Sequence, residues 1–398
     1  MKIAILTSGI LPVPAVQGGA VETLTDFYLA YNDHRHLHDI TIYSVWHPDV
    51  MQHPALQSAA NHYRFIRTDR IIDKLRRNIH RLLHSEDDYY HYTIEDYFTQ
   101  TIKHLKQEQY DAIILENRPG YAIKLKTITQ APLIYHLHNE KLTATIDKAQ
   151  TIYDAATTII CVSDYITNCV RTINAKDDKC VTVHNGIDLD AFNKKQVRKP
   201  AISFASNDFV LIYSGRMTKE KGIMQLIEAM DMLNNYPNIK LMVIGSTFFA
   251  NANNDDEFIK ELKSKATPLK ERIIFTGFIP YHKMPAYLAS AHVAIIPSVW
   301  DDPFPTTVLE AQAMGLPIIA TQRGGIPEEV SKENAILLTT GKDLSQQLAD
   351  TILYLYNHPE KCKSMSIASI RNSKQYSYMR YAEDFFNAFT KGIESNNR

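Results

Sequence analysis

Four charged side chains in the second half of the sequence carry its clearest chemistry. Arg216 and Lys221 follow an apolar run that ends at Tyr213, and guanidinium and ammonium groups bind phosphate oxygens through charge-assisted hydrogen bonds. Asp302 and Glu310 stand further along, separated by seven residues, and carboxylates accept hydrogen bonds from hydroxyl groups. Together they predict a site for a sugar joined to a nucleotide diphosphate.

Each half of this pattern also has a purely structural interpretation. Arg216 and Lys221 could form surface ion pairs, which exposed basic residues commonly do, and Glu310 could pair within its own helix. We favour a binding role for Glu310 because it stands between two apolar residues, a context typical of buried positions. Thr306 and Thr307 lie near a predicted helix start, where free amides can receive phosphate or sugar oxygens.

Two further candidates lie in the first half. Gly18 and Gly19 follow the first apolar run and open a helix, where the backbone can approach a ligand closely and free amides favour an anion; a simple turn is the alternative. His136 and His138 end another apolar run. We expect them on opposite faces of a strand and favour His138, where the chain leaves the sheet. A histidine with satisfied hydrogen bonds in the core or a loop is the alternative.

These residues stand at the ends of short apolar runs that alternate with amphipathic stretches. Such alternation predicts parallel sheets covered by helices, and its restart after residue 207 predicts two doubly wound α/β units in tandem. The polar stretch 190–207 predicts the linker, and the ligand crevice is expected between the units at the carboxyl ends of the strands. The predicted strands are 3–6, 40–45, 112–115, 132–137, 158–162, 210–213, 240–244, 272–275, 293–296 and 317–320.

The composition excludes several classes of protein. The chain has 398 residues with 43 basic and 44 acidic side chains, so no overall field attracts nucleic acid. Thr7, Ser8 and Gly9 interrupt the first apolar run, which favours a strand over a signal peptide, and no run approaches the roughly 18 apolar residues of a spanning helix. The four cysteines show no CxxC spacing and no histidine cluster at zinc-ligand spacing, which predicts reduced thiols in a cytoplasmic protein.

One segment departs from the alternating pattern. Between Arg64 and His84, seven basic residues face two acidic ones, and apolar residues recur at helical spacing. This predicts a basic amphipathic helix that either packs on the sheet or lies on an anionic membrane surface. No aromatic stacking platform is interleaved with the basic residues, which disfavours nucleic acid.

The sequence resembles the retaining glycosyltransferases of family 4, which have the GT-B architecture of two facing Rossmann-like domains with an interdomain cleft. The resemblance covers nearly the whole chain and implies a first domain at 1–189, completed by a helix at 375–398, and a second at 190–374. It is carried by Gly18-Gly19-Ala20, His138, Val162-Ser163, Asn185-Gly186-Ile187-Asp188, Gly215-Arg216, Lys221-Gly222, Gly245, Thr276-Gly277-Phe278 and the carboxylate region through Gly324-Gly325.

The resemblance implies a role for each residue of the donor site. Arg216 and Lys221 would hold the diphosphate, Glu310 the ribose, and Asp302 the donor sugar. Asp302 departs from the family pattern, which has glutamate there, and the shorter side chain withdraws the carboxylate by about one bond length. The implied catalytic residues are His138, Arg216, Lys221 and Asp302, and the implied donor-binding residues are Gly18, Gly19, Gly215, Gly245, Phe278, Ile279, Phe304, Pro305, Thr306, Thr307 and Glu310.

The implied activity is transfer of a sugar from a nucleotide sugar, with uridine as the base, to a saccharide, lipid-linked or other hydroxyl acceptor. No metal or other cofactor is expected, because basic side chains and helix amides can stabilise the leaving group. The expected setting is polysaccharide or glycoconjugate synthesis in the cytoplasm, at the inner face of the membrane. A nucleotide-sugar epimerase and a noncatalytic nucleotide-sugar-binding subunit remain alternatives. A nicotinamide dehydrogenase is disfavoured because no GxGxxG follows either first strand.

Overall fold

The chain forms two compact units. The computed structural model describes residues 1–68, 92–198, 201–245 and 257–396. Unit 1 comprises Met1–Asn185 and Tyr378–Arg398, and unit 2 comprises Gly186–Ser377. Unit 1 is therefore built from two separate stretches of the sequence, whereas unit 2 is continuous.

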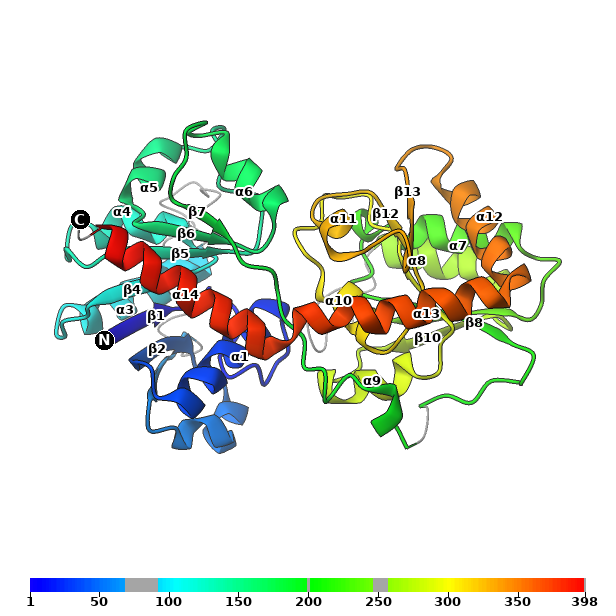
Figure 1. The fold of residues 1–398 in the computed structure, drawn as a ribbon, viewed down its shortest axis with the longest axis horizontal. Coiled ribbons are helices and arrows are strands. Elements are labelled where there is room, and N and C mark those ends of the chain that lie inside the picture. The colour runs from blue at the N-terminus through cyan, green and yellow to red at the C-terminus, as the bar shows by residue number, and fades with distance from the viewer. Residues whose placement is uncertain (69–91, 199–200, 246–256, 397–398) are drawn as a thin grey trace. The chain divides into compact units, whose positions relative to one another are not determined.

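Unit 1 contains a parallel sheet whose described strands run in the order β3-β2-β1-β4-β5-β6-β7 (Figure 1). Its inner strands are almost wholly buried, as expected of a sheet covered on both faces. The strands are β1 (Lys2–Leu6), β2 (Asp39–Val45), β3 (Asn61–Ile66), β4 (Ala112–Glu116), β5 (Leu133–Leu137), β6 (Thr158–Cys161) and β7 (Cys180–Thr182).

The last helix of the chain completes the core of unit 1. It runs along α1 and β6 (Figure 1), and the ring of Phe385 stacks on Tyr28 with centroids 4.3 Å apart. A Cβ on Gly392 would lie 1.9 Å from Thr158 Oγ1, so glycine permits this close approach to β6. The described helices are α1 (Ala20–Arg35), α3 (Tyr92–Leu105), α4 (Ala122–Leu125), α5 (Ala149–Ala155), α6 (Asp164–Arg171) and α14 (Tyr378–Asn396).

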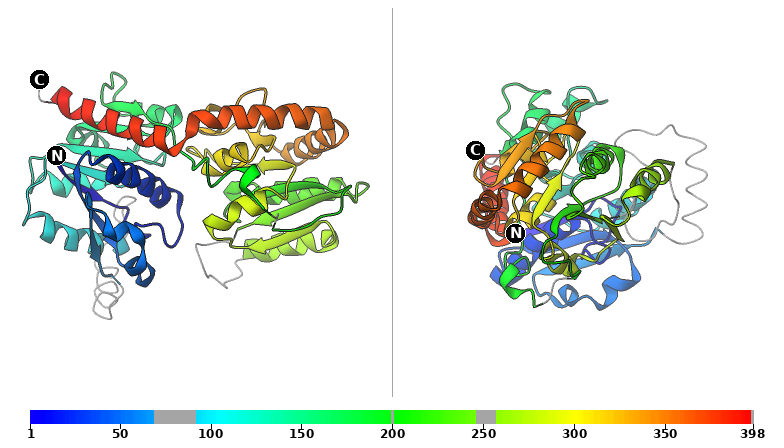
Figure 2. Two further views of the ribbon diagram at one scale, coloured as in Figure 1. Left: turned by 60° about the horizontal axis from the view of Figure 1, so that its bottom comes forward. Right: turned by 90° about the vertical axis from the view of Figure 1, so that its right-hand side faces the viewer.

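Unit 2 contains a second parallel sheet, which lies among helices (Figure 2). Its described strands run in the order β10-β9-β8-β11-β12-β13. The order runs outward from β8 on both sides. Strands β8 and β11 are therefore neighbours in the sheet, although β9 and β10 lie between them in the sequence. The strands are β8 (Phe209–Ser214), β9 (Ile239–Ile244), β10 (Ile273–Gly277), β11 (Val293–Ile296), β12 (Ile318–Thr321) and β13 (Ala335–Leu338).

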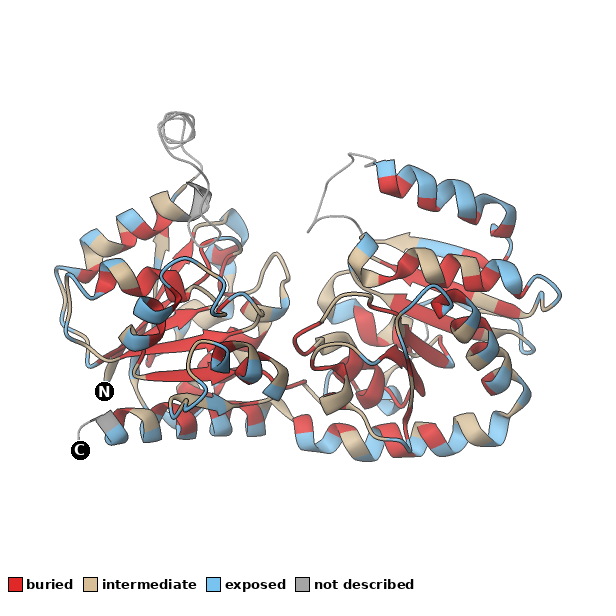
Figure 3. Ribbon diagram, turned by 90° about the horizontal axis from the view of Figure 1, so that it is seen from above, coloured by how far each residue is buried: buried red, intermediate tan, exposed pale blue. Residues whose placement is uncertain are grey.

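The outer helices α7, α8, α12 and α13 of unit 2 bury one stripe and expose the other, which Figure 3 shows as alternating colours along such helices. In α7, for example, Ile223, Leu226, Ile227 and Met230 are buried. The described helices are α7 (Ile223–Met232), α8 (Glu257–Ala266), α9 (Met284–Leu288), α10 (Thr306–Ala313), α11 (Ile326–Glu329), α12 (Leu344–Asn357) and α13 (Pro359–Ser373).

The predicted fold class is confirmed, since each unit has a Rossmann-like parallel sheet whose strands alternate with helices along the chain. The predicted basic helix is wrong at its start, because Arg64 lies in β3 and pairs with Glu108. Most of that segment, from 69 to 91, lies outside the described residues. None of the described helices combines the length and apolarity that a membrane crossing requires.

Candidate functional site

Three strands of unit 2 end in glycines whose backbones touch. The amide of Gly215 donates to the carbonyl of Ile244 at 3.0 Å, and the amide of Gly245 donates to the carbonyl of Gly277 at 3.0 Å. A Cβ on Gly245 would lie 1.9 Å from the Gly215 oxygen, and Gly245 has a φ of 135°. Only glycine fits there, so the predicted residues Gly215 and Gly245 lie side by side at the carboxyl edge of the sheet.

Lys221 and Asp302, 81 residues apart in sequence, form an ion pair in unit 2. The Lys221 ammonium also lies 5.4 Å from the centroid of the Trp300 ring. Gly222 holds this loop against the loop after β11, because its φ is 68° and a Cβ would lie 1.8 Å from the Pro297 oxygen. The structure thus brings together one predicted cation and one predicted carboxylate.

The backbone around Asp302 is fixed by the loop that precedes α11. The amide of Gly325 donates to the Asp302 carbonyl at 2.8 Å, and the amide of Gly324 donates to Asp301 Oδ1 at 3.1 Å. Arg323 pairs with Asp301 at 3.0 Å. Asp302 is therefore held by contacts from the next strand–helix connection, while the Arg216 side chain is exposed.

Helix α10 carries Glu310 into the interior of unit 2. Thr306 hydrogen-bonds the Glu310 carboxyl from one turn earlier, Pro305 is the N-cap, and Phe304 is buried. Burial raises the pKa of Glu310 to about 8, and the Thr306 hydrogen bond opposes this shift only in part. Glu310 therefore carries a proton at neutral pH and is able to donate as well as accept a hydrogen bond.

This raised pKa makes the stability of unit 2 depend on pH. Because the folded state holds the Glu310 proton more tightly, the stabilisation is complete below the ordinary pKa near 4.5 and is lost as the pH rises to about 8. We expect the free energy of unfolding to fall by about 1.4 kcal/mol per pH unit in this window from Glu310 alone. Denaturant unfolding of the wild-type protein and of a Glu310→Gln variant at pH values from 5 to 8 measures this dependence. If the free energy of unfolding changed equally with pH in both proteins, the assignment to Glu310 would be contradicted.

Glu329, at the end of α11, is a second buried acid of unit 2 that sequence reasoning missed. Its side chain is wholly buried, and neither carboxyl oxygen has a hydrogen-bond partner among the described residues. Burial and the nearby charge of Asp302 raise its pKa well above the usual value, and Lys221 opposes the shift. Lys221, Asp302 and Glu329 thus form one electrostatic group.

The residues predicted to contact the base follow strand β10, which borders β9 in the sheet of unit 2. Phe278 is 44% exposed, which is unusual for phenylalanine, and Ile279 is partly exposed. Gly277, just before them, has a φ of 73° and turns the chain away from the sheet. Their position at the carboxyl edge of the sheet fits the predicted role, which stays a prediction.

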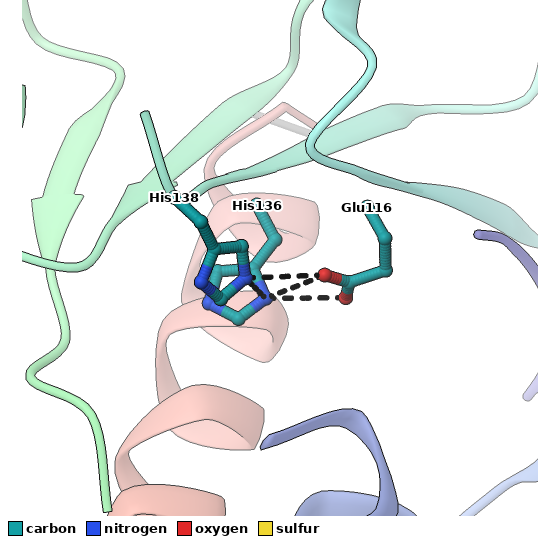
Figure 4. A group of neighbouring side chains, drawn as sticks. All are labelled: Glu116, His136 and His138. Atoms are coloured by element: carbon teal, nitrogen blue, oxygen red, sulfur yellow. Dashed lines mark hydrogen bonds and ion pairs between the residues drawn. The ribbon is translucent and has the colours of Figure 1, made fainter. Parts of the chain in front are cut away.

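In unit 1, His138 belongs to a compact cluster with Glu116 and His136 (Figure 4). His138 Nε2 lies 3.3 Å from Glu116 Oε2 and 3.2 Å from His136 Nδ1. His136 Nδ1 lies 3.1 Å from each oxygen of Glu116. Glu116 is the last residue of β4 and pairs in register with His136 of β5, so the sheet itself places the three groups.

The cluster shifts the protonation of its own members. Burial by itself raises the pKa of Glu116, but the two histidines outweigh it and lower this pKa to about 2. Burial, followed by the charge of His136, lowers the pKa of His138 to about 4 against the opposing effect of Glu116. At neutral pH Glu116 is therefore a carboxylate and His138 is a neutral imidazole.

The prediction that His136 and His138 face opposite sides is wrong. Residues two apart on a strand share a face, and the two rings lie with centroids 4.1 Å apart. Because the period of a strand places His136 and His138 on one face, His136 is a candidate on the same grounds as His138. Glu116 was missed because nothing in the sequence near it predicts a site; only its place at the end of a neighbouring strand does.

The predicted glycines of unit 1 adjoin another buried acid. Gly19 is the N-cap of α1 with a φ of 101°, and Gly18 has a φ of 75°. A Cβ on Gly19 would lie 2.1 Å from Glu22 Oε2, so glycine leaves space for that carboxyl. Burial raises the pKa of Glu22 to about 7 despite hydrogen bonds from the backbone and Ser8. The helix start thus faces an acid from its own first turn.

Comparison with known proteins gives consistent relatives. Residues 18–191 match the profile of Glycosyltransferase Family 4, and residues 194–371 match that of Glycosyl transferases group 1. Spore coat protein SA of Bacillus subtilis is 25% identical over 98% of this chain and 100% of its own length. An Escherichia coli UDP-Gal:alpha-D-GlcNAc-diphosphoundecaprenol alpha-1,3-galactosyltransferase is 26% identical over 39% of this chain and 40% of its own.

Solved structures agree on the fold. Anabaena HepE, in a crystal structure with UDP and glucose, superposes with a TM-score of 0.72 at 19% identity, over 98% of this chain and 99% of that one. The two profiles together span nearly the whole chain, and both Rossmann-like sheets are present. The chain therefore belongs to the family 4-like glycosyltransferases of GT-B fold.

Proposed function

We propose that this glycosyltransferase moves a sugar from a uridine diphosphate sugar to a hydroxyl acceptor with retention of the anomeric configuration. The observation that carries the donor assignment is the Lys221–Asp302 pair beside the glycine-rich strand ends of unit 2. UDP is supported by two relatives: HepE was crystallised with UDP and glucose, and the E. coli relative is named for UDP-galactose.

In this proposal the donor is bound by unit 2. Arg216 and Lys221 stabilise the charge that develops on the departing diphosphate, and the Lys221 ammonium has three N–H donors, enough to contact both Asp302 and a phosphate. Asp302 accepts a hydroxyl of the sugar, and neutral Glu310 accepts from and donates to the ribose. The role of His138 toward the donor stays a prediction.

The chemical step needs no covalent intermediate. The bond between the anomeric carbon and the diphosphate oxygen breaks as the acceptor oxygen bonds to the same face of that carbon. The departing diphosphate takes the acceptor's proton, which balances the charge. The charged side chains of Arg216 and Lys221 and the amides at the start of α10 supply the stabilisation that a divalent metal ion provides in other enzymes. We therefore propose that transfer requires no metal.

The acceptor proposed is a saccharide or lipid-linked saccharide of a surface polymer. The E. coli relative is named for a diphosphoundecaprenol-linked acceptor, which would place the reaction at the cytoplasmic face of a membrane. Basic residues between 70 and 81 of the sequence would supply an anionic-lipid contact. Flotation with anionic liposomes at low salt tests this part, and protein that stays at the bottom of the gradient excludes it.

A donor screen tests the main proposal. Purified protein is supplied with UDP-, GDP- and ADP-sugars and hydroxyl acceptors, and products are identified by mass spectrometry and by the anomeric signals in NMR spectra. We expect release of UDP coupled to a product of retained configuration. Free epimerised sugar without acceptor would indicate an epimerase, and unchanged transfer by an Arg216→Ala, Lys221→Ala double variant would reject the assigned roles.

Donor binding can be followed separately from turnover. The chain has two tryptophans, Trp46 in unit 1 and Trp300 in unit 2. Because Trp300 lies 5.4 Å from the Lys221 ammonium, UDP should change its fluorescence in a Trp46→Phe background. If calorimetry detected UDP binding but the Trp300 emission did not change, the diphosphate would bind at a site away from Lys221.

A further inference from the structure

We propose that Glu116, His136 and His138 of unit 1 bind a divalent transition metal of the Zn²⁺ class. The three residues belong to unit 1, whereas the Lys221–Asp302 pair belongs to unit 2. Figure 4 shows the two imidazoles and the carboxylate converging on one point from the ends of β4 and β5.

The distances between the ligand atoms match those of a metal site. The sides of the triangle formed by Glu116 Oε2, His136 Nδ1 and His138 Nε2 are 3.1, 3.3 and 3.2 Å long. Bonds of about 2.0–2.1 Å in a tetrahedron separate neighbouring ligand atoms by about 3.3–3.4 Å. One cation above this triangle would therefore reach all three atoms with small adjustments, leaving a fourth position for water.

The charge of the cluster also favours a cation. Glu116 is 1% exposed, and a buried carboxylate requires a compensating partner. Within the described parts of the chain its ion-pair partners are the two histidines alone, and no lysine or arginine pairs with it. In the hydrogen-bonded arrangement two imidazole nitrogens 3.2 Å apart must share one carboxylate. A divalent cation instead accepts a lone pair from each of the three atoms.

The surroundings of the cluster fix its ligands as those of metal sites do. The Tyr28 hydroxyl donates to Glu116 Oε1 at 2.7 Å, which leaves Oε2 for a metal; ligating carboxylates commonly have such a second partner. The backbone amide of His138 donates to Asn117 Oδ1 at 3.0 Å, and the backbone amide of Asn117 donates to the His136 carbonyl at 2.8 Å. These bonds hold both histidines at the edge of the sheet.

The donor set selects the class of metal. Two imidazoles and one carboxylate suit Zn²⁺, Co²⁺ or Ni²⁺, whereas Mg²⁺ and Ca²⁺ prefer oxygen ligands alone. His138 is the member nearest the surface, with 5% of its side chain exposed. The metal therefore enters past His138, and its binding should stabilise the folded form of unit 1.

Metal binding to the full chain tests the proposal. After EDTA treatment and desalting, the protein is titrated with ZnCl₂ by calorimetry and with CoCl₂ by visible absorption. We expect one equivalent of Zn²⁺ per chain, the intense visible bands of four-coordinate Co²⁺, and a higher melting temperature of unit 1. MgCl₂ should produce none of these effects. Glu116→Gln and His138→Gln should each weaken Zn²⁺ binding by at least about 100-fold, because each removes one of three ligands.

Two tyrosines provide a matched pair of variants. Tyr28→Phe removes the hydrogen bond to Glu116 and should weaken binding by about 10- to 100-fold. Tyr381→Phe removes a buried hydroxyl of the same region that has no partner among the described residues, and should leave binding unchanged. Equal Zn²⁺ affinity in wild-type, Glu116→Gln and His138→Gln proteins would assign the metal to surface histidines. Absence of Zn²⁺ binding to folded wild-type protein would show that protons alone hold the cluster together. Either result overturns the proposal.

Discussion

Replacing Lys221 by methionine is expected to reduce sugar transfer by about 10²- to 10³-fold, the usual effect of removing one group that stabilises transition-state charge. Methionine retains much of the apolar stem and removes the ammonium that pairs with Asp302 and lies beside Trp300. Because Asp302 then loses its cation next to the buried Glu329, affinity for UDP should fall as well. Initial rates and UDP calorimetry measure the two effects.

Lys219 supplies the matched control for this variant. It is an exposed cation two residues earlier in the same loop, over the Phe258 ring at 5.9 Å, and exposed cations contribute little. Lys219→Met should retain nearly full transfer. If both variants lost activity equally, the effect would come from the net charge of the loop; full activity in Lys221→Met would remove this residue from the mechanism.

The second large effect is expected on stability. Phe385→Ala should destabilise unit 1 by about 3–5 kcal/mol, as is usual when a buried phenylalanine is truncated. Phe385 is wholly buried in α14, stacks on Tyr28 at 4.3 Å, and also contacts His136 and Phe386. The exposed Asn387 on the same helix is the control, and Asn387→Ala should change stability by less than about 0.5 kcal/mol.

The two tryptophans allow each unit to be followed alone. In a Trp300→Phe background the remaining Trp46 reports unit 1, and in a Trp46→Phe background Trp300 reports unit 2. Phe385→Ala should shift the denaturant midpoint seen by Trp46 and leave that of Trp300 in place. A shift of the Trp300 midpoint alone would contradict the assignment of α14 to the core of unit 1.

The sequence predicted every central strand of both sheets and the edge strand β10, and it missed the other three edge strands. Buried parallel strands are continuous apolar runs, and all ten predicted strands exist. The missed strands β3, β7 and β13 each border only one neighbour. Edge strands need fewer apolar residues, and β7 has only three residues in total, so their sequences resemble loops.

The candidate site divides in the same way. Lys221 and Asp302 could be predicted because each lies in a recognisable motif. Glu116 and Glu329 could not, because their significance arises only when the sheet places Glu116 beside His136 and the loop before α11 places Glu329 near Asp302. A search for zinc-ligand spacing fails for the same reason, since Glu116 and His136 are 20 positions apart in the sequence.

The two ends of unit 2 lie side by side, because Ile187 and Ser377 form a β-bridge and the Ile187 amide donates to the Tyr376 carbonyl at 2.8 Å. Unit 2 is thus topologically an insertion, entered and left through adjacent residues. During synthesis it emerges complete before α14 does, so a ribosome-bound chain can fold its second unit while the first still lacks its closing helix. Adjacent ends also mean that a short peptide could replace residues 186–377 and leave unit 1 as one uninterrupted polypeptide.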